Sequence, residues 1–247
     1  MLLDEVIRAA AELSQDVYQA TPSAGVLIES ENAAFIHRTD SAGRFYICFR
    51  GSNDKQDWLD NFSTSLFPFF SGYAHSGFVE HWDQLSELVE ELALQNTDRE
   101  IILCGHSLGG ALAALAAIHL NRKGFSWDSL NVCTFGAPRA LDVKLATSVR
   151  CVSLRVVNYG DPVPLAPLSI VPRWAGGKDC GRYQHHSSAA WFLMEDGTIR
   201  TERKSFLYRV FMAAWRWFSG DSLVSNHSMD EYVKRLRLTP IYREIRT

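Results

Sequence analysis

The chain has 247 residues, of which 47% are hydrophobic and 21% charged, and its formal net charge is −3. This length and apolar content allow one substantial core, so we expect a single domain over residues 1–247. The charged residues are mixed along the chain, which excludes a general attraction to nucleic acid or to anionic surfaces. No apolar stretch in the sequence is long enough to predict a membrane span.

The amino-terminal residues and the cysteines bear on the compartment. Residues 1–8 include Asp4 and Glu5 and lack the apolar core of a signal peptide, so they predict an amphipathic helix. The five cysteines are odd in number, and four lie in apolar, strand-like runs where we expect buried thiols rather than disulfides: Cys48, Cys104, Cys133 and Cys151. A reducing compartment fits this pattern, and we expect a cytoplasmic or non-classically secreted protein.

In chain order, the first elements are a helix and a set of antiparallel strands. Apolar residues recur at helical spacing over 2–19 and stop before Thr21-Pro22. Short apolar or alternating runs follow at 26–28, 34–36 and 45–49, separated by turn-forming residues. This pattern predicts strands joined by hairpins at the start of a sheet.

The remaining elements alternate between helix and strand. The pattern predicts helices over 78–94 and 110–120, and strands at 101–104, 132–135 and 152–157. We therefore predict an α/β fold with a mostly parallel central sheet, antiparallel amino-terminal strands and helices on both faces. Ligand-binding loops in such sheets gather at the carboxyl ends of the strands.

Ser107 is the candidate nucleophile. It is the central residue of the pentapeptide at 105–109, Gly-His-Ser-Leu-Gly, which joins the predicted strand 101–104 to an alanine-rich helix. The flanking glycines allow a sharp turn that exposes the hydroxyl at the sheet edge, next to the amino terminus of the helix. A structural glycine turn is the alternative, but the strand before and the helix after are the context that a nucleophile elbow requires.

A serine hydroxyl needs an imidazole base and usually a carboxylate that orients the imidazole. In α/β-hydrolases the chain order is Ser, then Asp or Glu, then His. Asp161 follows an apolar strand and is held between Gly160 and Pro162, and His227 directly precedes a helical pattern. We predict that these two are the acid and the base; a turn-forming aspartate and a histidine in a capping loop are the alternatives.

Three further histidines compete for a role. His185 and His186 also follow Asp161, but neighbouring side chains in an extended segment point to opposite faces, and no third ligand has a recognisable spacing. We therefore predict no metal site. His106 precedes Ser107, and we expect its ring to pack beside the site as a candidate substrate contact rather than to act as the base.

Acyl transfer also needs two donors for the oxyanion of the tetrahedral intermediate. The N–H of Leu108, at the start of the predicted helix, is one candidate. Ser52 is the other, because Gly51 before it permits a tight backbone after the strand 45–49. Taken alone, this segment would be an ordinary turn at the end of a strand.

Seven sequence blocks occur together in one order: 48–52, 57–58, 75–78, 105–113, 134–139, 158–164 and 227–229. Together they resemble lipase class 3, the family of the filamentous-fungal triacylglycerol lipases, over roughly 24–232. The resemblance implies an α/β-hydrolase fold and hydrolysis of lipid esters with neither a metal nor an organic cofactor. Its triad positions fall on Ser107, Asp161 and His227, and its oxyanion-hole positions on Ser52 and Leu108.

Two segments are candidates for contact with lipid. Residues 53–72 stand where family lipases carry a lid and include Trp58, Phe62 and Phe67; a mobile cover over an acyl groove and ordinary core packing both explain them. Residues 165–220 are expected to form a cap-like insertion. Its aromatic run at 205–219 fits either an interfacial helix or a buried cap helix.

These features predict a serine carboxylic-ester hydrolase acting on lipid esters, an acylglycerol lipase, that makes transient contact with a membrane or a lipid droplet. A phospholipase A and a feruloyl-type esterase use the same machinery and remain alternatives. A function of another class, a catalytically silent lipid-binding module, requires a triad that has lost its activity. The complete set of triad and oxyanion residues argues against that function.

Overall fold

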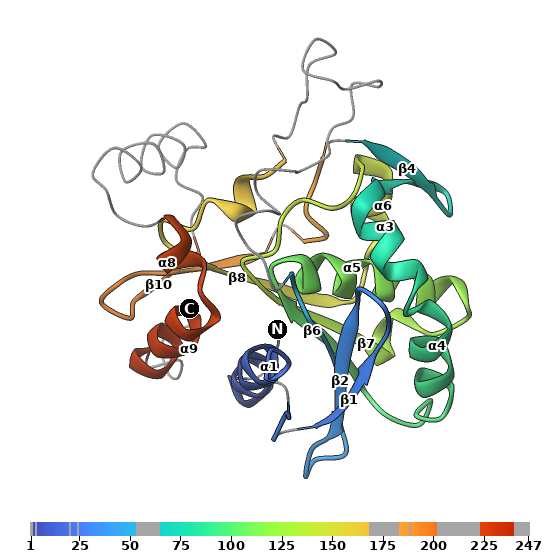
Figure 1. Ribbon diagram of the computed structural model, residues 1–247, viewed down its shortest axis with the longest axis horizontal. Helices are drawn as coiled ribbons and strands as arrows, with labels where there is room; N and C mark the ends of the chain where they lie inside the picture. Colours follow the sequence, from blue (N-terminus) through green and yellow to red (C-terminus); the bar gives the residue numbers. More distant parts are fainter. Residues whose placement is uncertain are drawn as a thin grey trace.

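The computed structural model describes residues 2, 4–19, 21–23, 25–52, 65–167, 183–187, 189–201 and 223–239. Within them, an eight-stranded sheet has the order β1-β2-β3-β6-β7-β8-β9-β10 (Figure 1). The strands are β1 (Val26–Glu29), β2 (Ala34–Thr39), β3 (Phe45–Phe49), β6 (Ile101–His106), β7 (Leu130–Phe135), β8 (Val152–Asn158), β9 (Ala190–Leu193) and β10 (Ile199–Arg200).

The sheet is antiparallel at both edges and parallel in the middle. Strands β1, β2 and β3 pair antiparallel, as β9 and β10 do, whereas β3, β6, β7, β8 and β9 pair parallel. Every residue of β3, β6 and β7 is buried, since helices cover both faces of a parallel sheet. The predicted fold class is confirmed.

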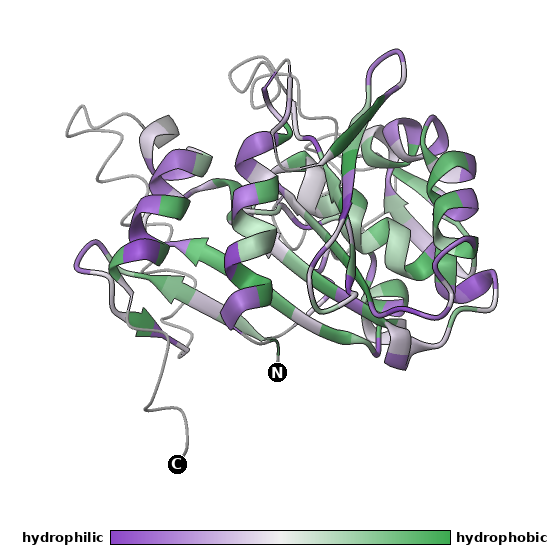
Figure 2. Ribbon diagram, turned by 90° about the horizontal axis from the view of Figure 1, so that it is seen from below, coloured by the Kyte–Doolittle hydropathy of each residue, from purple (hydrophilic) through white to green (hydrophobic). Residues whose placement is uncertain are grey.

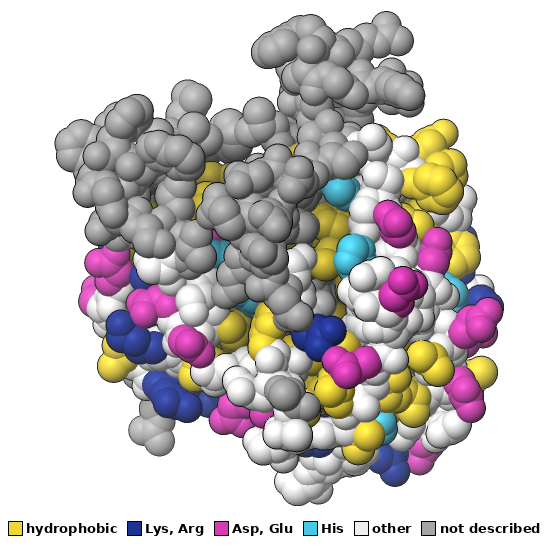
Figure 3. All heavy atoms as spheres, viewed as in Figure 1, with side chains coloured by type: hydrophobic (Ala, Val, Ile, Leu, Met, Phe, Trp, Pro, Cys, Tyr) yellow, Lys and Arg dark blue, Asp and Glu magenta, His cyan; other side chains and the backbone are white. Residues whose placement is uncertain are grey.

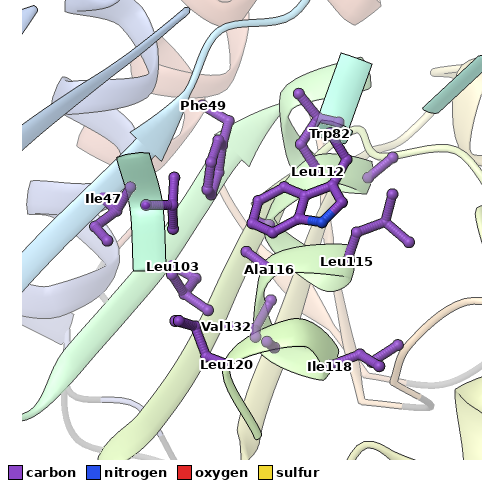
Figure 4. Packing of buried hydrophobic residues seen from close by; sticks show 14 of the residues in the cluster. Ile47, Phe49, Trp82, Leu103, Leu112, Leu115, Ala116, Ile118, Leu120 and Val132 are labelled. Carbon is purple, nitrogen blue, oxygen red and sulfur yellow. The ribbon is translucent and has the colours of Figure 1, made fainter. Parts of the chain in front are cut away.

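Two helical layers enclose the sheet. Helices α3 (Ser76–Asp83), α4 (Ser86–Leu94) and α5 (Leu108–Arg122) pack on one face, with the shorter α6 (Val143–Ser148). Figure 4 shows the indole of Trp82, on α3, beside Leu112 and Leu115 of α5. The other face carries α1 (Asp4–Asp16) and α9 (Met229–Leu238), which lie side by side in Figure 1. In Figure 2, both helices carry hydrophilic and hydrophobic residues on different sides, and the hydrophobic residues face the sheet.

The connections contain shorter elements. One-turn helices are η1 (Trp127–Ser129), η2 (Val163–Leu165) and α8 (Leu223–His227). As predicted, Cys48, Cys104, Cys133 and Cys151 are buried free thiols. None of the helices in the described ranges is both long and apolar enough to cross a membrane.

The helix predicted over 78–94 is two helices. After α3 ends at Asp83, the N–H of Leu85 bonds to the carbonyl of Trp82 at 2.9 Å, and α4 begins at Ser86. The Leu85 side chain is fully buried at the break. The apolar periodicity therefore continues across the break, which explains why the sequence pattern did not reveal it.

The segments predicted as lid and cap are described only in part. Residues 53–64 lie outside the described ranges, and β4 (Leu66–Phe69) pairs antiparallel with β5 (Gly72–His75) in a separate hairpin. Residues 65–72, the described part of the lid-like segment, are therefore mostly strand and turn. Of 165–220, residues 168–182, 188 and 202–220 lie outside the described ranges, while β9 and β10 within that span extend the central sheet.

Candidate active site

Ser107 lies at the junction between β6 and α5. Its backbone has φ 57° and ψ −127°, outside the ordinary regions for a residue with a side chain, and its N–H bonds to the carbonyl of Phe135 at 2.9 Å. The glycines on either side make this turn possible. A Cβ at Gly105 would lie 2.4 Å from the carbonyl carbon of Gly109, and one at Gly109 would lie 2.1 Å from the carbonyl oxygen of Phe49.

The structure brings Ser107, His227 and Asp161 together from three separate parts of the chain. His227 Nε2 lies 2.9 Å from Ser107 Oγ, and His227 Nδ1 lies 2.9 Å from Asp161 Oδ2. All three residues are buried. An acceptor nitrogen facing the hydroxyl and a carboxylate behind the imidazole form the arrangement that activates a serine for attack.

Asp161 is held by donors besides His227. The hydroxyl of Tyr232 donates to Asp161 Oδ2 at 2.6 Å, and the N–H of Val163 donates to Oδ1 at 2.9 Å. Burial raises the pKa of Tyr232 well above its ordinary value, so this hydroxyl stays protonated and remains a donor. The carboxylate is therefore fixed on both oxygens and presents Oδ2 to the imidazole.

Gly136, at the end of β7, leaves room for the triad. Its φ is +58°, and a Cβ there would lie 2.7 Å from Asp161 Oδ2 and 3.1 Å from His227 Cε1. Any side chain would meet both the carboxylate and the imidazole. Glycine is therefore required by the backbone conformation and by the space.

The residue before His227 is anchored to the sheet. Asn158, the last residue of β8, donates through its amide to the Asn226 carbonyl at 3.0 Å, and Arg235 of α9 donates to Asn226 Oδ1 at 2.6 Å. Both contacts are buried. They fix the backbone that carries the imidazole, since a histidine can act as a base only when its ring keeps its place.

The predicted oxyanion donors flank Ser107. Leu108 is the first residue of α5, so its N–H has no acceptor within the helix and points out of the helix amino terminus. Ser52 follows Gly51, and a Cβ at Gly51 would lie only 3.4 Å from Ser107 Cβ. The turn after β3 therefore runs directly beside the Ser107 side chain.

Of the predicted substrate and lid contacts, Trp58 and Phe62 lie outside the described residues. Phe67, on β4, is 53% exposed. His106 has no exposed surface and bonds through its ring to Tyr18 and to the backbone of His227, so it lies behind the triad rather than at a substrate surface.

His185 and His186 lie apart from the triad. Both line a cavity of about 560 Å³ between α6 and the start of β8, and no triad residue lines it. Burial, followed by the nearby charge of Arg155, lowers the pKa of His185 well below its ordinary value and that of His186 to about 3, so both rings are neutral. Among the residues that the structure describes, no three His, Cys, Asp or Glu side chains gather as metal ligands.

Sequence reasoning missed the residues that support the triad from behind. Tyr232 appears in the sequence only as one apolar position of a helical pattern, and Tyr18 as a residue near the end of the first helix. Gly136 lies in a block that resembles the family, yet nothing in that block gives its distance from Asp161. A tyrosine close to the predicted base in sequence is the one signal that could have identified Tyr232.

Comparison with known proteins places the chain in a family. The family model described as lipase (class 3) matches residues 46–170, which is half of the chain and includes most of β3, the Ser107 turn and Asp161. The chain belongs to the lipase class 3 family. The resemblance seen in the sequence blocks is confirmed.

Its curated relatives in this family include fungal lipases. A lipase of Rhizomucor miehei is 34% identical over 146 residues, covering 54% of this chain and 40% of the relative. Secreted mono- and diacylglycerol lipase 1 of Fusarium solani is 28% identical over 144 residues, covering 54% and 42%. Secreted mono- and diacylglycerol lipase A of Penicillium camembertii is 28% identical over 173 residues, covering 66% and 54%. The chain thus spans about half, or less, of the length of these relatives.

Solved structures of lipases share the fold. The Rhizomucor miehei lipase in its propeptide complex has a TM-score of 0.61 at 22% identity, covering 77% of this chain and 67% of that one. The lipase of Rhizopus microsporus var. chinensis has a TM-score of 0.62 at 22% identity, covering 81% and 75%. At this identity the likeness shows the fold alone.

The prediction of a cytoplasmic or non-classically secreted protein is wrong. Relatives of this chain in Fusarium solani and Penicillium camembertii are named secreted lipases. The prediction relied partly on thiols such as Cys48 and Cys104, which are core residues between packed layers. A buried thiol that packs as a small apolar side chain carries no information about the compartment.

Proposed function

We propose that this member of the family is a serine carboxylic-ester hydrolase that acts on lipid esters, an acylglycerol lipase. The observation that carries the proposal is the hydrogen-bonded series Ser107, His227 and Asp161, with 2.9 Å between successive partners. The position of Ser107 between a strand and the amino terminus of α5 supports the role of nucleophile. Neither a metal nor an organic cofactor is needed for this chemistry.

In the acylation half of the proposed reaction, Ser107 Oγ attacks the ester carbonyl carbon while His227 Nε2 takes its proton. The carbonyl π electrons move to the oxygen, and the N–H groups of Ser52 and Leu108 stabilise this oxyanion. Asp161 stabilises the imidazolium. The intermediate then collapses, the bond to the leaving oxygen breaks, and His227 protonates the departing alcohol.

In the deacylation half, water attacks the acyl carbon of the ester on Ser107. His227 Nε2 takes a proton from this water, and the second oxyanion forms at the same two N–H groups. Collapse releases the carboxylic acid, and the proton passes from His227 back to Ser107 Oγ. The enzyme returns to its starting state without any external reductant or oxidant.

Acylglycerols are the proposed substrates. The names of the Fusarium solani and Penicillium camembertii relatives specify mono- and diacylglycerols, and the same names support an extracellular site of action. Since the triad cleaves esters generally, the shape of the acyl and head-group sites selects the substrate. Hydrolysis rates on phospholipid and feruloyl-type esters, compared with those on acylglycerols, therefore test the proposed substrate class.

Contact with a lipid surface is part of the proposal. Three aromatic side chains of the β4–β5 hairpin are about half exposed: Phe67 at 53%, Phe70 at 50% and Tyr73 at 49%. Figure 3 shows hydrophobic side chains gathered at the upper right, where Figure 1 has this hairpin. Arg122 donates to Ser71 Oγ at the hairpin turn at 2.7 Å, which adds a cation beside the aromatic rings. Exposed aromatic rings with a neighbouring cation suit the boundary between lipid and water.

The test is hydrolysis of monomeric and emulsified acylglycerols, phospholipids and a feruloyl ester by the wild type and by Ser107→Ala. We expect wild-type turnover to be highest on emulsified acylglycerol, and Ser107→Ala to lose at least about 10³-fold in kcat while its melting temperature stays unchanged. Equal specific activity on monomeric and emulsified ester would refute the role of the lipid surface. Lipid binding without any turnover would favour a binding module.

A further inference from the structure

Tyr18 connects two parts of the site that are far apart in sequence. It lies just after α1, and its hydroxyl accepts the N–H of Gly51 at 3.2 Å and contacts His106 Nδ1 at 3.1 Å. The other nitrogen of that ring, His106 Nε2, lies 2.7 Å from the carbonyl oxygen of His227. One continuous series of hydrogen bonds therefore runs from the turn before Ser52 to the backbone of the proposed base.

The two ends of the series fix the direction of the first and the last bond, and the protonation of the His106 ring fixes the bond between them. The N–H of Gly51 can only donate, so the Tyr18 oxygen accepts, and the Tyr18 proton is free for His106 Nδ1. The carbonyl of His227 can only accept, so His106 Nε2 must carry a proton. In the neutral imidazole, Nδ1 is then unprotonated and accepts from the Tyr18 hydroxyl. Burial raises the pKa of Tyr18 above its ordinary value, which keeps its hydroxyl a donor.

Close packing restricts the movement of the side chains and backbone that form this series of hydrogen bonds. The rings of Tyr18 and His106 meet edge to face, with centroids 6.0 Å apart, and the rings of His106 and His227 lie 4.5 Å apart. A Cβ at Gly51 would lie 2.4 Å from the Tyr18 hydroxyl and 2.8 Å from the carbonyl of His106. The turn after β3 therefore approaches Tyr18 as closely as its backbone allows.

We propose that Tyr18 and His106 are positioning residues. They join the oxyanion turn at 51–52 to the backbone of His227 and fix the position of both relative to Ser107. This inference rests on the proposed function of Ser107, His227 and Ser52. His106 has no exposed surface and so acts through the groups that its ring contacts. Tyr18 lies outside the residues that match the family profile, and it acts through the two groups its hydroxyl bonds.

Tyr18→Phe tests the series without removing the ring. The variant keeps the edge-to-face packing but leaves the Gly51 N–H without its acceptor and His106 Nδ1 without its donor. We expect kcat on an ester to fall about tenfold, with KM changing by less than about twofold, because geometry in the transition state is lost while ground-state binding is kept. An unchanged kcat would overturn the proposal.

Tyr46→Phe is the matched control. Tyr46 is fully buried in the same layer, and its hydroxyl donates to Asp40 at 3.1 Å, away from the triad. We expect this variant to lower the melting temperature and to leave kcat unchanged. Equal losses of kcat in the two variants would show that removing any buried tyrosine hydroxyl has this effect, and would overturn the proposal.

A double variant tests whether Tyr18 and His106 act as one unit. In His106→Gln, the amide can still donate to the His227 carbonyl, but no ring nitrogen remains for Tyr18. Adding Tyr18→Phe to His106→Gln should lower kcat by no more than about twofold beyond the worse single variant, since both changes break the same series. Losses that multiply would show that the two residues act independently.

A measurement that does not depend on activity completes the test. In protein with ¹⁵N-labelled histidine, we expect the NMR spectrum to show His106 protonated on Nε2 and unprotonated on Nδ1, and Tyr18→Phe to shift the Nδ1 resonance. A proton on Nδ1 in the wild type would overturn the series. If the wild type hydrolyses no ester, the proposed function fails while this spectrum still decides the hydrogen-bond series.

Discussion

Within the described part of the chain, Asp161 accepts hydrogen bonds from three residues, which together hold both carboxylate oxygens. The imidazole of His227 and the hydroxyl of Tyr232 share Oδ2, while the Val163 N–H holds Oδ1. This arrangement keeps the proton of the neutral imidazole on Nδ1 and leaves Nε2 as an acceptor for Ser107. At the scale of single residues, the imidazole tautomer is therefore the property that the proposed site depends on most.

Asp161→Asn tests this dependence. The amide can present N–H groups to His227 Nδ1, which favours the tautomer with its proton on Nε2, and that nitrogen can no longer accept from Ser107. We expect kcat to fall about 10³- to 10⁴-fold with little change in melting temperature. Asp142→Asn is the control, because Asp142 caps α6 through a 2.7 Å bond to the Leu145 N–H and contacts no triad residue. Similar kinetics for the two variants would contradict the role of Asp161.

His186 predicts a dependence of stability on pH. Its pKa is lowered by burial from about 6.5 to about 3 in the folded state, so below pH 6.5 the unfolded chain binds a proton that the folded chain does not. The free energy of unfolding should therefore fall as the pH drops from 6.5 towards 3, by up to about 1.4 kcal/mol per pH unit for this residue. Urea unfolding at several pH values should show a shallower dependence for His186→Gln than for the wild type. Equal slopes would contradict a neutral buried His186.

At the scale of elements, the junction between β6 and α5 is the most constrained part of the structure. Helix α5 packs its amino terminus so close to β3 that a side chain at Gly109 would meet the backbone oxygen of Phe49 at 2.1 Å. This close approach also brings Leu108 and Ser107 beside the turn at Gly51. The two donors of the proposed oxyanion hole thus depend on the packing of α5 against β3.

Gly109→Ala tests this packing. We expect the free energy of unfolding to fall by about 2 kcal/mol or more, and ester turnover to be lost with it, because α5 must move away from β3. Gly77→Ala is the matched control on α3, where a Cβ would meet its nearest neighbour outside the helix, the His75 ring, at an ordinary 3.5 Å. Chemical unfolding measures both variants. A Gly109→Ala protein as stable as Gly77→Ala would contradict the packing.

The elements differ in how well the sequence predicted them. Six strands of the sheet, β1, β2, β3, β6, β7 and β8, and the turn at Ser107 were predicted because apolar runs and glycines report on local backbone structure. Strands β9 and β10 were not predicted, and they lie within the segment expected to form a cap-like insertion. The chain order of Ser107, Asp161 and His227 led to three residues that the structure brings together. The contacts of Tyr18 and Tyr232 could not be predicted. Each contact depends on where α1 or α9 packs on the sheet, and local sequence patterns do not report which residues of separate elements come together. The break at Leu85 was missed because its burial continues the helical pattern.

At the scale of the whole molecule, the sheet collects residues from the entire chain at the carboxyl ends of β3, β6, β7 and β8. Ser107 and Gly136 directly follow β6 and β7, and the turn at 51–52 and Asp161 come within three residues of the ends of β3 and β8. The helical layer on one face supplies α5, and the layer on the other supplies Tyr18, after α1, and Tyr232, on α9. Family membership and this geometry lead to the same proposed chemistry.

The most direct test of the central claim is labelling with a serine-reactive phosphonate, with the modified residue identified by mass spectrometry and ester turnover measured on the same sample. We expect one equivalent of label on Ser107, loss of turnover in proportion to labelling, and very slow labelling of His227→Ala. Label on a different residue, or full turnover after Ser107 is completely modified, would contradict the assignment of Ser107 as the nucleophile.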